Sequence, residues 1–457
     1  MARPSFLDRF LSVADTRPAL RIDRWLTYGE LFDLGARAAG WLREHGVERG
    51  DAVAIQLENG LDLVAAHLGC MALGAVRVPL NAHYRAAELR PILEDAAPKL
   101  IVAREPALYE RPVVTHVGRG AAVHDWPSPP DDVTAMLFTS GTTGRAKGVP
   151  QSYWMWESNL DALTTRWRLA GDDRLHLVLP LFHTHGLVLG LHGTLLRGAS
   201  AIVGPRFEPV PPPPDATHFY GVPTYYRRWV EVMNPRDWAH LKLLVSGSDG
   251  LPAALSDEVL ARSGHRVLER YGMTETVMIA SNPFAGERRA GTVGTALDGV
   301  DLRIVDGEVQ VRGPSVFSGY RPRPDPDAFT SDGFFRTGDA GELEADGYLR
   351  LVGRQKDLVI VGGVNVSPAE VEEHLRGVPG VAEIGVCGLP DADLNEVVVA
   401  AVVPDGTVPE PALRASLEAA ARGLSGLKRP RRWVFVESLP RNALGKLQRR
   451  RIAAYFG

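Results

Sequence analysis

The chain contains little cysteine. Cys70 and Cys387 are the only two among its 457 residues, and they stand in separate apolar regions. This distribution excludes a disulfide framework, argues against a cysteine metal site and fits a reducing compartment. We therefore expect a cytoplasmic protein.

The chain also lacks a long uninterrupted apolar segment and a large net charge. Asp8 and Arg9 break the N-terminal apolar run, and Pro180 and several histidines break the apolar stretch 177–196. We therefore expect neither a signal peptide nor a membrane span. The net charge of -4 gives no general electrostatic reason to expect nucleic acid or an anionic membrane as a partner.

Alternating apolar strands and amphipathic helices dominate the first two thirds of the chain, which favours an α/β fold of doubly wound, mostly parallel sheets. Short alternating strands separated by glycine turns predict a small antiparallel β subdomain at about 295–355. Residues 356–457 read as a compact α+β unit of ordinary domain size. We thus predict a large N-terminal domain, 1–355, and a small C-terminal domain, 356–457.

A segment rich in glycine, serine and threonine, 139–148, follows the predicted buried strand 135–138. Its glycines allow the backbone to approach an anion, its hydroxyls donate hydrogen bonds, and its lysine adds a positive charge. It is not a Walker loop, because Gly148 follows the lysine. Taken alone, the segment also fits an ordinary surface turn. The residues expected to hold phosphate are Thr139, Ser140, Gly141, Thr142, Thr143, Gly144 and Lys147.

Other candidate site residues come shortly after predicted strands. Thr274 and Glu275 follow one strand together, which suits one phosphate contact and one metal contact. Asp339, after a glycine, could accept hydrogen bonds from ribose hydroxyls. Lys446 lies in a glycine-containing turn, which on its own is usually solvated surface.

Two further positions are candidates for an acid-binding pocket. His185, beside Gly186, could line a pocket or be an ordinary buried histidine. Arg227 and Arg228 stand among aromatic residues, and an arginine turned inward there would require an anion. Two solvated arginines at a helix start are the simpler interpretation.

Together these motifs resemble the adenylate-forming superfamily of acyl-CoA synthetases, firefly luciferase and nonribosomal-peptide adenylation domains. The resemblance covers nearly the whole chain, and the motifs come in the family's order. They are 139–148, 271–275, 337–339, 353–354 and 440–446. Within the superfamily, segments 180–187, 222–228 and 269–276 look most like malonyl-CoA synthetases.

The resemblance implies a two-step reaction that uses ATP, Mg²⁺ and coenzyme A on a small carboxylic acid. Lys446 would bridge the attacking carboxylate and the α-phosphate, Thr274 would contact that phosphate, and Glu275 would hold the metal. The residues implied for adenosine are Ser246, Gly247, Ser248, Tyr271, Gly272, Met273, Asp339 and Arg354. The residues implied for the acid are His185, Arg228, Asp249 and Met278.

The small domain is implied to be mobile. In the family it rotates about a hinge that matches Lys356, withdraws the lysine matching Lys446 and brings the Gly362–Gly363 turn to the site as a passage for pantetheine. One active site thus serves both half-reactions.

One departure from the family pattern bears on the substrate. Asp249 and Gly250 replace the usual Ala-Pro pair, and a carboxylate there would repel a second carboxylate or attract an amine. Alternatives to malonate or methylmalonate are another small or aromatic acid, possibly amino-substituted, and an acceptor other than CoA, such as a carrier protein. A non-catalytic binding protein is disfavoured because Glu275, Asp339, Arg354 and Lys446 are all present.

Overall fold

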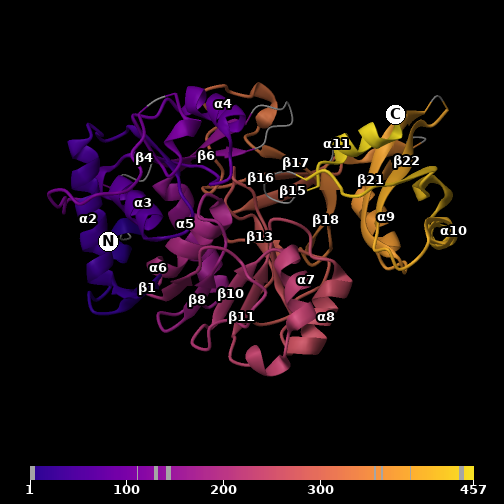
Figure 1. Cartoon of the computed structure of the whole chain (residues 1–457), viewed down its shortest axis with the longest axis horizontal. Coiled ribbons are helices and arrows are strands. Elements are labelled where there is room, and N and C mark those ends of the chain that lie inside the picture. Colours follow the sequence, from indigo (N-terminus) through magenta and orange to yellow (C-terminus); the bar gives the residue numbers. More distant parts are fainter. Residues whose placement is uncertain are drawn as a thin grey trace. The chain divides into compact units, whose positions relative to one another are not determined.

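The computed structural model describes residues 6–110, 112–127, 132–139, 146–354, 357–361, 364–391, 393–441 and 447–457. The chain forms two compact units, coloured along the sequence in Figure 1. The first comprises Met1–Leu302, Val311–Phe335 and Asp346–Tyr348, and the second comprises Arg303–Gln310, Arg336–Ala345 and Leu349–Gly457.

The larger sheet of the first unit is nine-stranded, with the order β14-β13-β12-β11-β10-β8-β9-β1-β2. Strands β1, β9, β8, β10, β11 and β12 run parallel, whereas β2, β13 and β14 join antiparallel at the edges. The strands are β1 Pro18–Arg21, β2 Trp25–Thr27, β8 Arg174–Leu177, β9 Ser200–Val203, β10 His218–Gly221, β11 Leu243–Ser246, β12 Leu268–Tyr271, β13 Ala280–Ser281 and β14 Thr295–Ala296.

A five-stranded sheet in the same unit has the order β5-β3-β4-β6-β7, in which only β7 is antiparallel to its neighbour. Its strands are β3 Ala52–Gln56, β4 Val76–Pro79, β5 Leu100–Ala103, β6 Val133–Thr139 and β7 Lys147–Ser152. The hairpin partners β6 and β7 carry the two ends of the predicted phosphate loop, and Thr139 pairs with Lys147.

Helices connect the parallel strands, as the alternating pattern predicted. The first long helix begins at a capping box, because the Thr27 side chain accepts from the Glu30 amide and Glu30 accepts from the Thr27 amide. The helices of the first unit are α1 Phe6–Leu11, α2 Tyr28–Glu44, α3 Leu61–Leu73, α4 Ala86–Ala96, α5 Tyr153–Arg166, α6 Gly193–Leu196, α7 Pro223–Val232 and α8 Ala253–Ser263. Residues His185–His192 form a π-helical segment before α6.

The second unit contains most of a four-stranded sheet, β15-β16-β17-β18, in which β17 and β18 are antiparallel. It also contains a five-stranded sheet in which β20, β19, β22 and β21 pair in that order and β23 pairs with β22. These strands are β15 Asp301–Val305, β16 Glu308–Arg312, β17 Phe335–Leu343, β18 Leu349–Arg354, β19 Val359–Val361, β20 Val364–Val366, β21 Val381–Asp391, β22 Asn395–Pro404 and β23 Arg432–Phe435. The helices are α9 Pro368–Arg376, α10 Glu410–Ala421 and α11 Arg449–Ile452.

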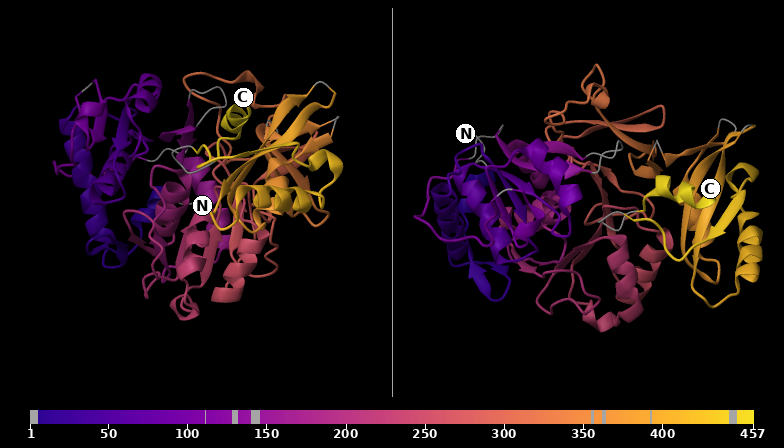
Figure 2. Two further views of the ribbon diagram at one scale, coloured as in Figure 1. Left: turned by 45° about the vertical axis from the view of Figure 1, so that its right-hand side comes forward. Right: turned by 45° about the horizontal axis from the view of Figure 1, so that its top comes forward.

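Apolar side chains of strand β22 point to both faces of the C-terminal sheet, and helices cover both faces. Val398, Ala400 and Val402 belong to one apolar cluster with residues of α9 and α10, whereas Val397, Val399 and Ala401 pack with Ile452 of α11. Figure 2 shows α9 and α10 beside this sheet in two further views.

The predicted α/β class, with parallel sheets in a large N-terminal part and a separate C-terminal part, is confirmed. The strands of the predicted β subdomain group largely with the C-terminal residues. The predicted division after residue 355 stays a prediction, and Lys356 lies outside the described residues.

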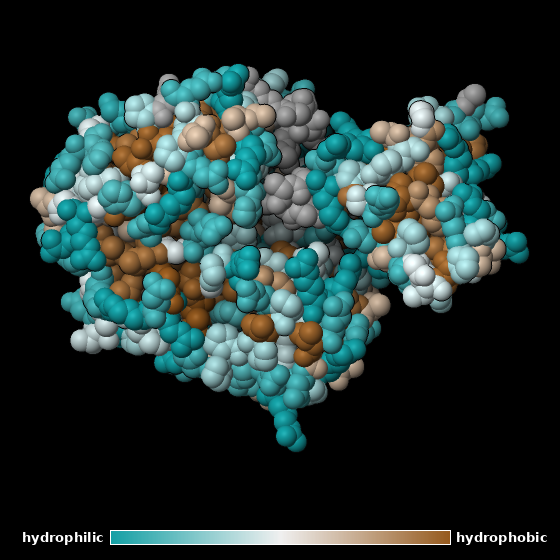
Figure 3. Space-filling view, viewed as in Figure 1, coloured by the Kyte–Doolittle hydropathy of each residue, from teal (hydrophilic) through white to brown (hydrophobic). Residues whose placement is uncertain are grey.

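The visible surface mixes hydrophilic and hydrophobic side chains (Figure 3). Within the described ranges, every helix is too short or too polar to cross a bilayer.

Candidate active site

Several predicted site residues of the first unit lie at or after the carboxyl ends of neighbouring parallel strands of the nine-stranded sheet. Strands β8, β10, β11 and β12 are adjacent and parallel, and they end at Leu177, Gly221, Ser246 and Tyr271. Ligands of open α/β sheets bind at this edge, because the loops that leave it are adjacent in space. The sheet therefore gathers segments that are up to about a hundred residues apart in sequence.

His185 lies at the start of the π-helical segment and is almost fully buried. Its Nδ1 is 3.4 Å from Ser248 Oγ, and its ring is nearly parallel to that of Tyr220, with centroids 6.4 Å apart. Its Nε2 has no hydrogen-bond partner among the described residues. Burial, reinforced by the nearby positive charge of Arg270, holds the pKa of His185 well below its usual value, so the imidazole is neutral near pH 7.

Arg270 is a candidate site residue that the sequence analysis did not single out. It lies on β12 and is only 4% exposed, and its Nε and Nη2 have no hydrogen-bond partner in the described part of the chain. Burial lowers its pKa to about 9. A Cβ atom on Gly247 would lie 2.4 Å from Arg270 Cζ, so the guanidinium packs directly against the backbone of that glycine. A buried, unpaired cation of this kind calls for an anionic ligand.

Glu269, the residue before Arg270, is also buried, and burial raises its pKa to about 7. Its carboxylate accepts from the backbone amides of Gly291 and Leu251. The charged pair Glu269-Arg270 inside an otherwise apolar strand was the sequence signal for this part of the site.

Glu275 is held in a defined position. It is 4% exposed, and its Oε1 accepts from the hydroxyl of Tyr320 at 2.9 Å. Its backbone carbonyl accepts from the amide of Phe317 at 2.8 Å. The preceding residue, Thr274, is fixed through its carbonyl oxygen, which accepts from Gln151 Nε2 at 2.7 Å.

The loop after β12 is tight and strained. A Cβ on Gly272 would lie 2.1 Å from the carbonyl oxygen of Val277, so only glycine fits there. Val277, a β-branched residue, has φ +57°, a conformation rarely adopted by such residues and typical of functional sites. Met278 is buried, and Asn159 binds both its backbone amide and its carbonyl.

Lys147 is paired with a carboxylate and an aromatic ring. Its Nζ lies 2.7 Å from Asp325 Oδ2 and 4.6 Å from the centroid of the Tyr320 ring. The hydrogen bond from Lys147 holds the pKa of Asp325 below its usual value. Tyr320 therefore contacts both Lys147 and Glu275, the predicted phosphate-binding and metal-binding residues of this unit. The predicted loop residues Ser140, Gly141, Thr142, Thr143 and Gly144 lie outside the described residues.

Two predicted acid-binding residues are exposed. Arg228 is exposed on α7. Asp249 is also exposed, and its carboxylate accepts from the amide of Gly250 at 2.9 Å. Ser246, in contrast, is buried, and its Oγ has no partner within the described ranges. The buried positive charge of this sheet edge thus comes from Arg270, and the acid-binding role of Arg228 stays a prediction.

In the second unit, Asp339 and Arg354 form an ion pair across β17 and β18, with Arg354 Nε 2.8 Å from Asp339 Oδ1. Arg354 also donates to the carbonyl of Thr337 at 3.1 Å. The pair therefore presents a carboxylate and a guanidinium side by side.

Lys446, Gly362 and Gly363 lie outside the described residues, but both flanks of the Lys446 turn are anchored. Arg441 and Leu447 form an antiparallel bridge, and Arg441 lies 2.6 Å from Glu383. Farther on, Arg449 makes a 2.6 Å ion pair with the buried Glu372.

Comparison with known proteins agrees with this arrangement. Residues 7–321 match the AMP-binding enzyme family, and residues 370–446 match the AMP-binding enzyme C-terminal domain. A malonate–CoA ligase of Arabidopsis thaliana is 32% identical over 505 residues, covering 96% of this chain and 83% of the relative. A feruloyl-CoA synthase of Amycolatopsis sp is 33% identical over 472 residues, covering 94% of each chain.

Solved structures show the same fold over the whole chain. The ATP-bound crystal structure of MatB from Rhodopseudomonas palustris superposes with a TM-score of 0.89 and 35% identity, covering 100% of this chain and 99% of that one. The match covers both units of the chain. The chain belongs to the AMP-binding enzyme family.

Proposed function

We propose that the chain is an ATP-dependent, AMP-forming acid–CoA ligase whose substrate is a small dicarboxylic acid, with malonate or methylmalonate as the best fit. The family and its CoA-ligase relatives support the reaction class. Overall sequence identity does not identify the acid substrate, because a malonate ligase and a feruloyl-CoA synthase are about equally similar to this chain. The observation that carries the choice of acid is the buried, unpartnered Arg270.

A dicarboxylate satisfies this part of the sheet edge better than a monocarboxylate does. One carboxylate must remain available for activation, and the other would pair with Arg270 while the neutral His185 and the hydroxyl of Ser246 supply hydrogen bonds. An acid that ends in a methyl group or an aromatic ring would leave the guanidinium buried and unpaired. Leaving one partner of a buried ion pair uncompensated costs about 3–5 kcal/mol, which is more than a hundredfold in affinity.

In the first half-reaction a carboxylate oxygen of the acid attacks the α-phosphorus of ATP, and the bond to the bridging oxygen of the β-phosphate breaks, releasing pyrophosphate. Both reactants are anionic, so electrostatic stabilisation supplies most of the catalysis. Lys147 and the loop 139–148 would hold the β- and γ-phosphates, Thr274 would contact the α-phosphate, and Lys446 would neutralise the attacking carboxylate.

Magnesium fits this chain as an ion bound chiefly by ATP. Among the described residues there is no group of three or more His, Cys, Asp and Glu side chains spaced to hold a metal. Mg²⁺ in nucleotide sites is commonly bound by one or two carboxylates together with phosphate oxygens. Glu275, oriented by Tyr320, would be that carboxylate, and the ion would neutralise phosphate charge.

In the second half-reaction the thiol sulfur of CoA attacks the carbonyl carbon of the acyl-adenylate, and the bond from that carbon to the phosphate oxygen breaks, releasing AMP. The thiol proton leaves to solvent or to AMP. Asp339 and Arg354 would bind the ribose, and Gly362 and Gly363 would line the passage for pantetheine. The thiols of Cys70 and Cys387 are free and buried, which suits a cytoplasmic location.

Pyrophosphate release, measured over a panel of acids with and without CoA, tests the proposal. We expect malonate or methylmalonate to give the highest kcat/KM, and CoA to be required for turnover. Preference for an aromatic or amino acid would refute the dicarboxylate assignment. Multiple turnovers without CoA would point to another acceptor, and no pyrophosphate with any acid would refute the enzyme.

A further inference from the structure

Gln151 connects two segments that the proposed mechanism uses. It lies on β7, the strand that begins with Lys147, and its side chain is fully buried. Its Nε2 donates to the carbonyl oxygen of Thr274 at 2.7 Å, and its Oε1 accepts from Trp156 Nε1 at 2.8 Å. One side chain thus joins the strand leaving the phosphate loop to the loop that follows β12.

The two partners fix the direction of the amide. An indole N–H only donates and a backbone carbonyl only accepts, so the Gln151 oxygen must face Trp156 and its nitrogen must face Thr274. A flipped amide would lose both hydrogen bonds. Because both side chains are buried, each lost hydrogen bond would be costly, and the orientation is strongly determined.

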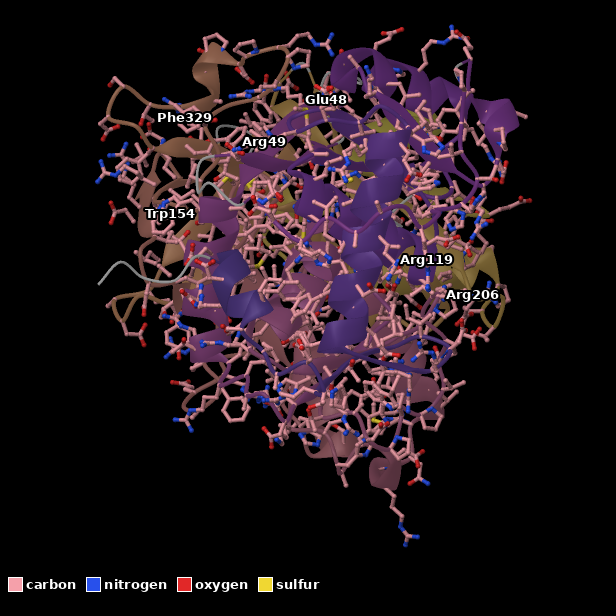
Figure 4. The ribbon with its side chains drawn as sticks, turned by 90° about the vertical axis from the view of Figure 1, so that its left-hand side faces the viewer. Glu48, Arg49, Arg119, Trp154, Arg206 and Phe329 are labelled. Atoms are coloured by element: carbon pink, nitrogen blue, oxygen red, sulfur yellow. The ribbon has the colours of Figure 1, made fainter. Side chains whose placement is uncertain are left out.

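Trp156 is itself held rigidly. Its ring centroid lies 4.8 Å from Arg77 Cζ and 4.7 Å from the ring centroid of His192, and all three side chains are buried. Trp154, on the same helix α5, is instead 42% exposed and is labelled in Figure 4. Trp156 therefore provides a fixed point from which Gln151 reaches Thr274.

Hydrogen bonds hold the chain on both sides of the peptide between Thr274 and Glu275. Tyr320 holds the Glu275 carboxylate, and the backbone amide of Phe317 holds its carbonyl. Gln151 fixes the carbonyl on the other side, at Thr274. Loss of that bond would allow the peptide to rotate, and both side chains would move with it.

We propose that Gln151 is a positioning residue for the adenylation step: it orients the Thr274–Glu275 peptide so that the hydroxyl meets the α-phosphate and the carboxylate meets the metal. The inference rests on the roles proposed above for Thr274 and Glu275. Gln151 contacts these residues and not the substrates, so its loss should lower kcat and leave KM for ATP nearly unchanged. Small misplacements of reacting groups lower rates by about ten- to a hundredfold.

Malonate-dependent ATP–pyrophosphate exchange by Gln151→Met tests this directly. Methionine has a similar length but cannot make the two hydrogen bonds, and we expect kcat to fall at least about tenfold with KM for ATP within about twofold of wild type. The matched control is Gln56→Met. Gln56 is also buried, donates to the carbonyls of Asn81 and Tyr84, and accepts from Tyr109. Its replacement should lower the melting temperature without lowering kcat.

Gln151→Glu gives a second readout that a purely structural role would not produce. A protonated carboxyl group can still donate to Thr274 and accept from Trp156, whereas a carboxylate cannot donate. Its kcat relative to wild type should therefore fall steeply between about pH 6 and pH 9, while the ratio for Gln151→Met stays flat. Trp156→Phe should lower kcat in the same direction, and Trp154→Phe should not.

The outcomes distinguish failure of the Gln151 inference from failure of the proposed function. If Gln151→Met loses stability as Gln56→Met does but keeps its kcat, and if Gln151→Glu shows no pH-dependent loss, Gln151 is only a structural residue. If wild-type protein shows no exchange with any acid, the proposed function fails and this inference falls with it. Exchange that is lost in Thr274→Ala but kept in Gln151→Met overturns the inference alone.

Discussion

Replacement of Arg270 by methionine should separate substrate recognition from stability. Burial lowers the pKa of Arg270 from its usual value to about 9, a shift that corresponds to roughly 5 kcal/mol disfavouring the charged form. Methionine fills a similar volume without a charge, and apolar replacement of buried charges is often neutral or stabilising. The melting temperature of Arg270→Met should therefore equal or exceed that of wild type.

The malonate activity of Arg270→Met should fall, although its melting temperature should not. The variant has no cation for the second carboxylate, so kcat/KM for malonate should fall by about a hundredfold or more. Malonate should raise the melting temperature of wild type, because a ligand that binds only the folded state stabilises it, and should leave that of Arg270→Met unchanged. Thermal shift and ATP–pyrophosphate exchange measure the two effects.

Arg228→Met is the matched control for this experiment, because Arg228 is exposed on α7. If Arg228→Met loses malonate activity and Arg270→Met retains it, the second carboxylate is held at α7 and the reasoning from burial is refuted. If both variants lose activity, the two arginines share the acid. Unchanged malonate activity in both would exclude the dicarboxylate assignment.

Three further predictions concern other parts of the site. The pKa of Glu269 is raised from 4.5 to about 7, so the folded protein keeps a proton that the unfolded chain releases. The stability due to this group is therefore lost as pH rises through 7. Measured by urea unfolding, the free energy of unfolding of Glu269→Gln relative to wild type should rise by at most roughly 3 kcal/mol between pH 4.5 and 8. Asp325→Asn breaks the 2.7 Å ion pair with Lys147, in which both partners are partly exposed. Release of Lys147 should lower KM for ATP about two- to fivefold. A higher KM would mean that Asp325 aids ATP binding. Lys446→Ala should abolish acid-dependent pyrophosphate release yet keep thioester formation from supplied acyl-adenylate, and equal loss of both would contradict a rotating small domain.

Local chemistry led the sequence analysis to predict phosphate-handling roles for particular residues, and these roles stay predictions. Lys147 on the strand leaving a glycine-rich loop, and Thr274 with Glu275 at a strand end, carry their chemistry in a short stretch of chain. The structure adds their neighbours, Tyr320 and Gln151, which come from distant segments and show no motif.

The proposed acid-binding residues were harder to choose from sequence, because burial is a property of the whole fold. Arg228 and Arg270 both stand beside aromatic residues in the sequence, but Arg228 is exposed on α7, whereas Arg270 is buried on β12 and packs against the backbone of Gly247. Asp249 was expected to affect the pocket, but the turn leaves its carboxylate exposed and bonded to the amide of Gly250. Its effect on specificity stays a prediction.

The most direct test of the account compares malonate with propionate, which has the same number of carbons and one carboxylate fewer, in ATP–pyrophosphate exchange by the wild-type protein. A buried guanidinium left unpaired by propionate predicts a preference for malonate of about a hundredfold or more in kcat/KM. Equal kcat/KM for the two acids, or a preference for propionate, would contradict the assignment of Arg270 to a second carboxylate.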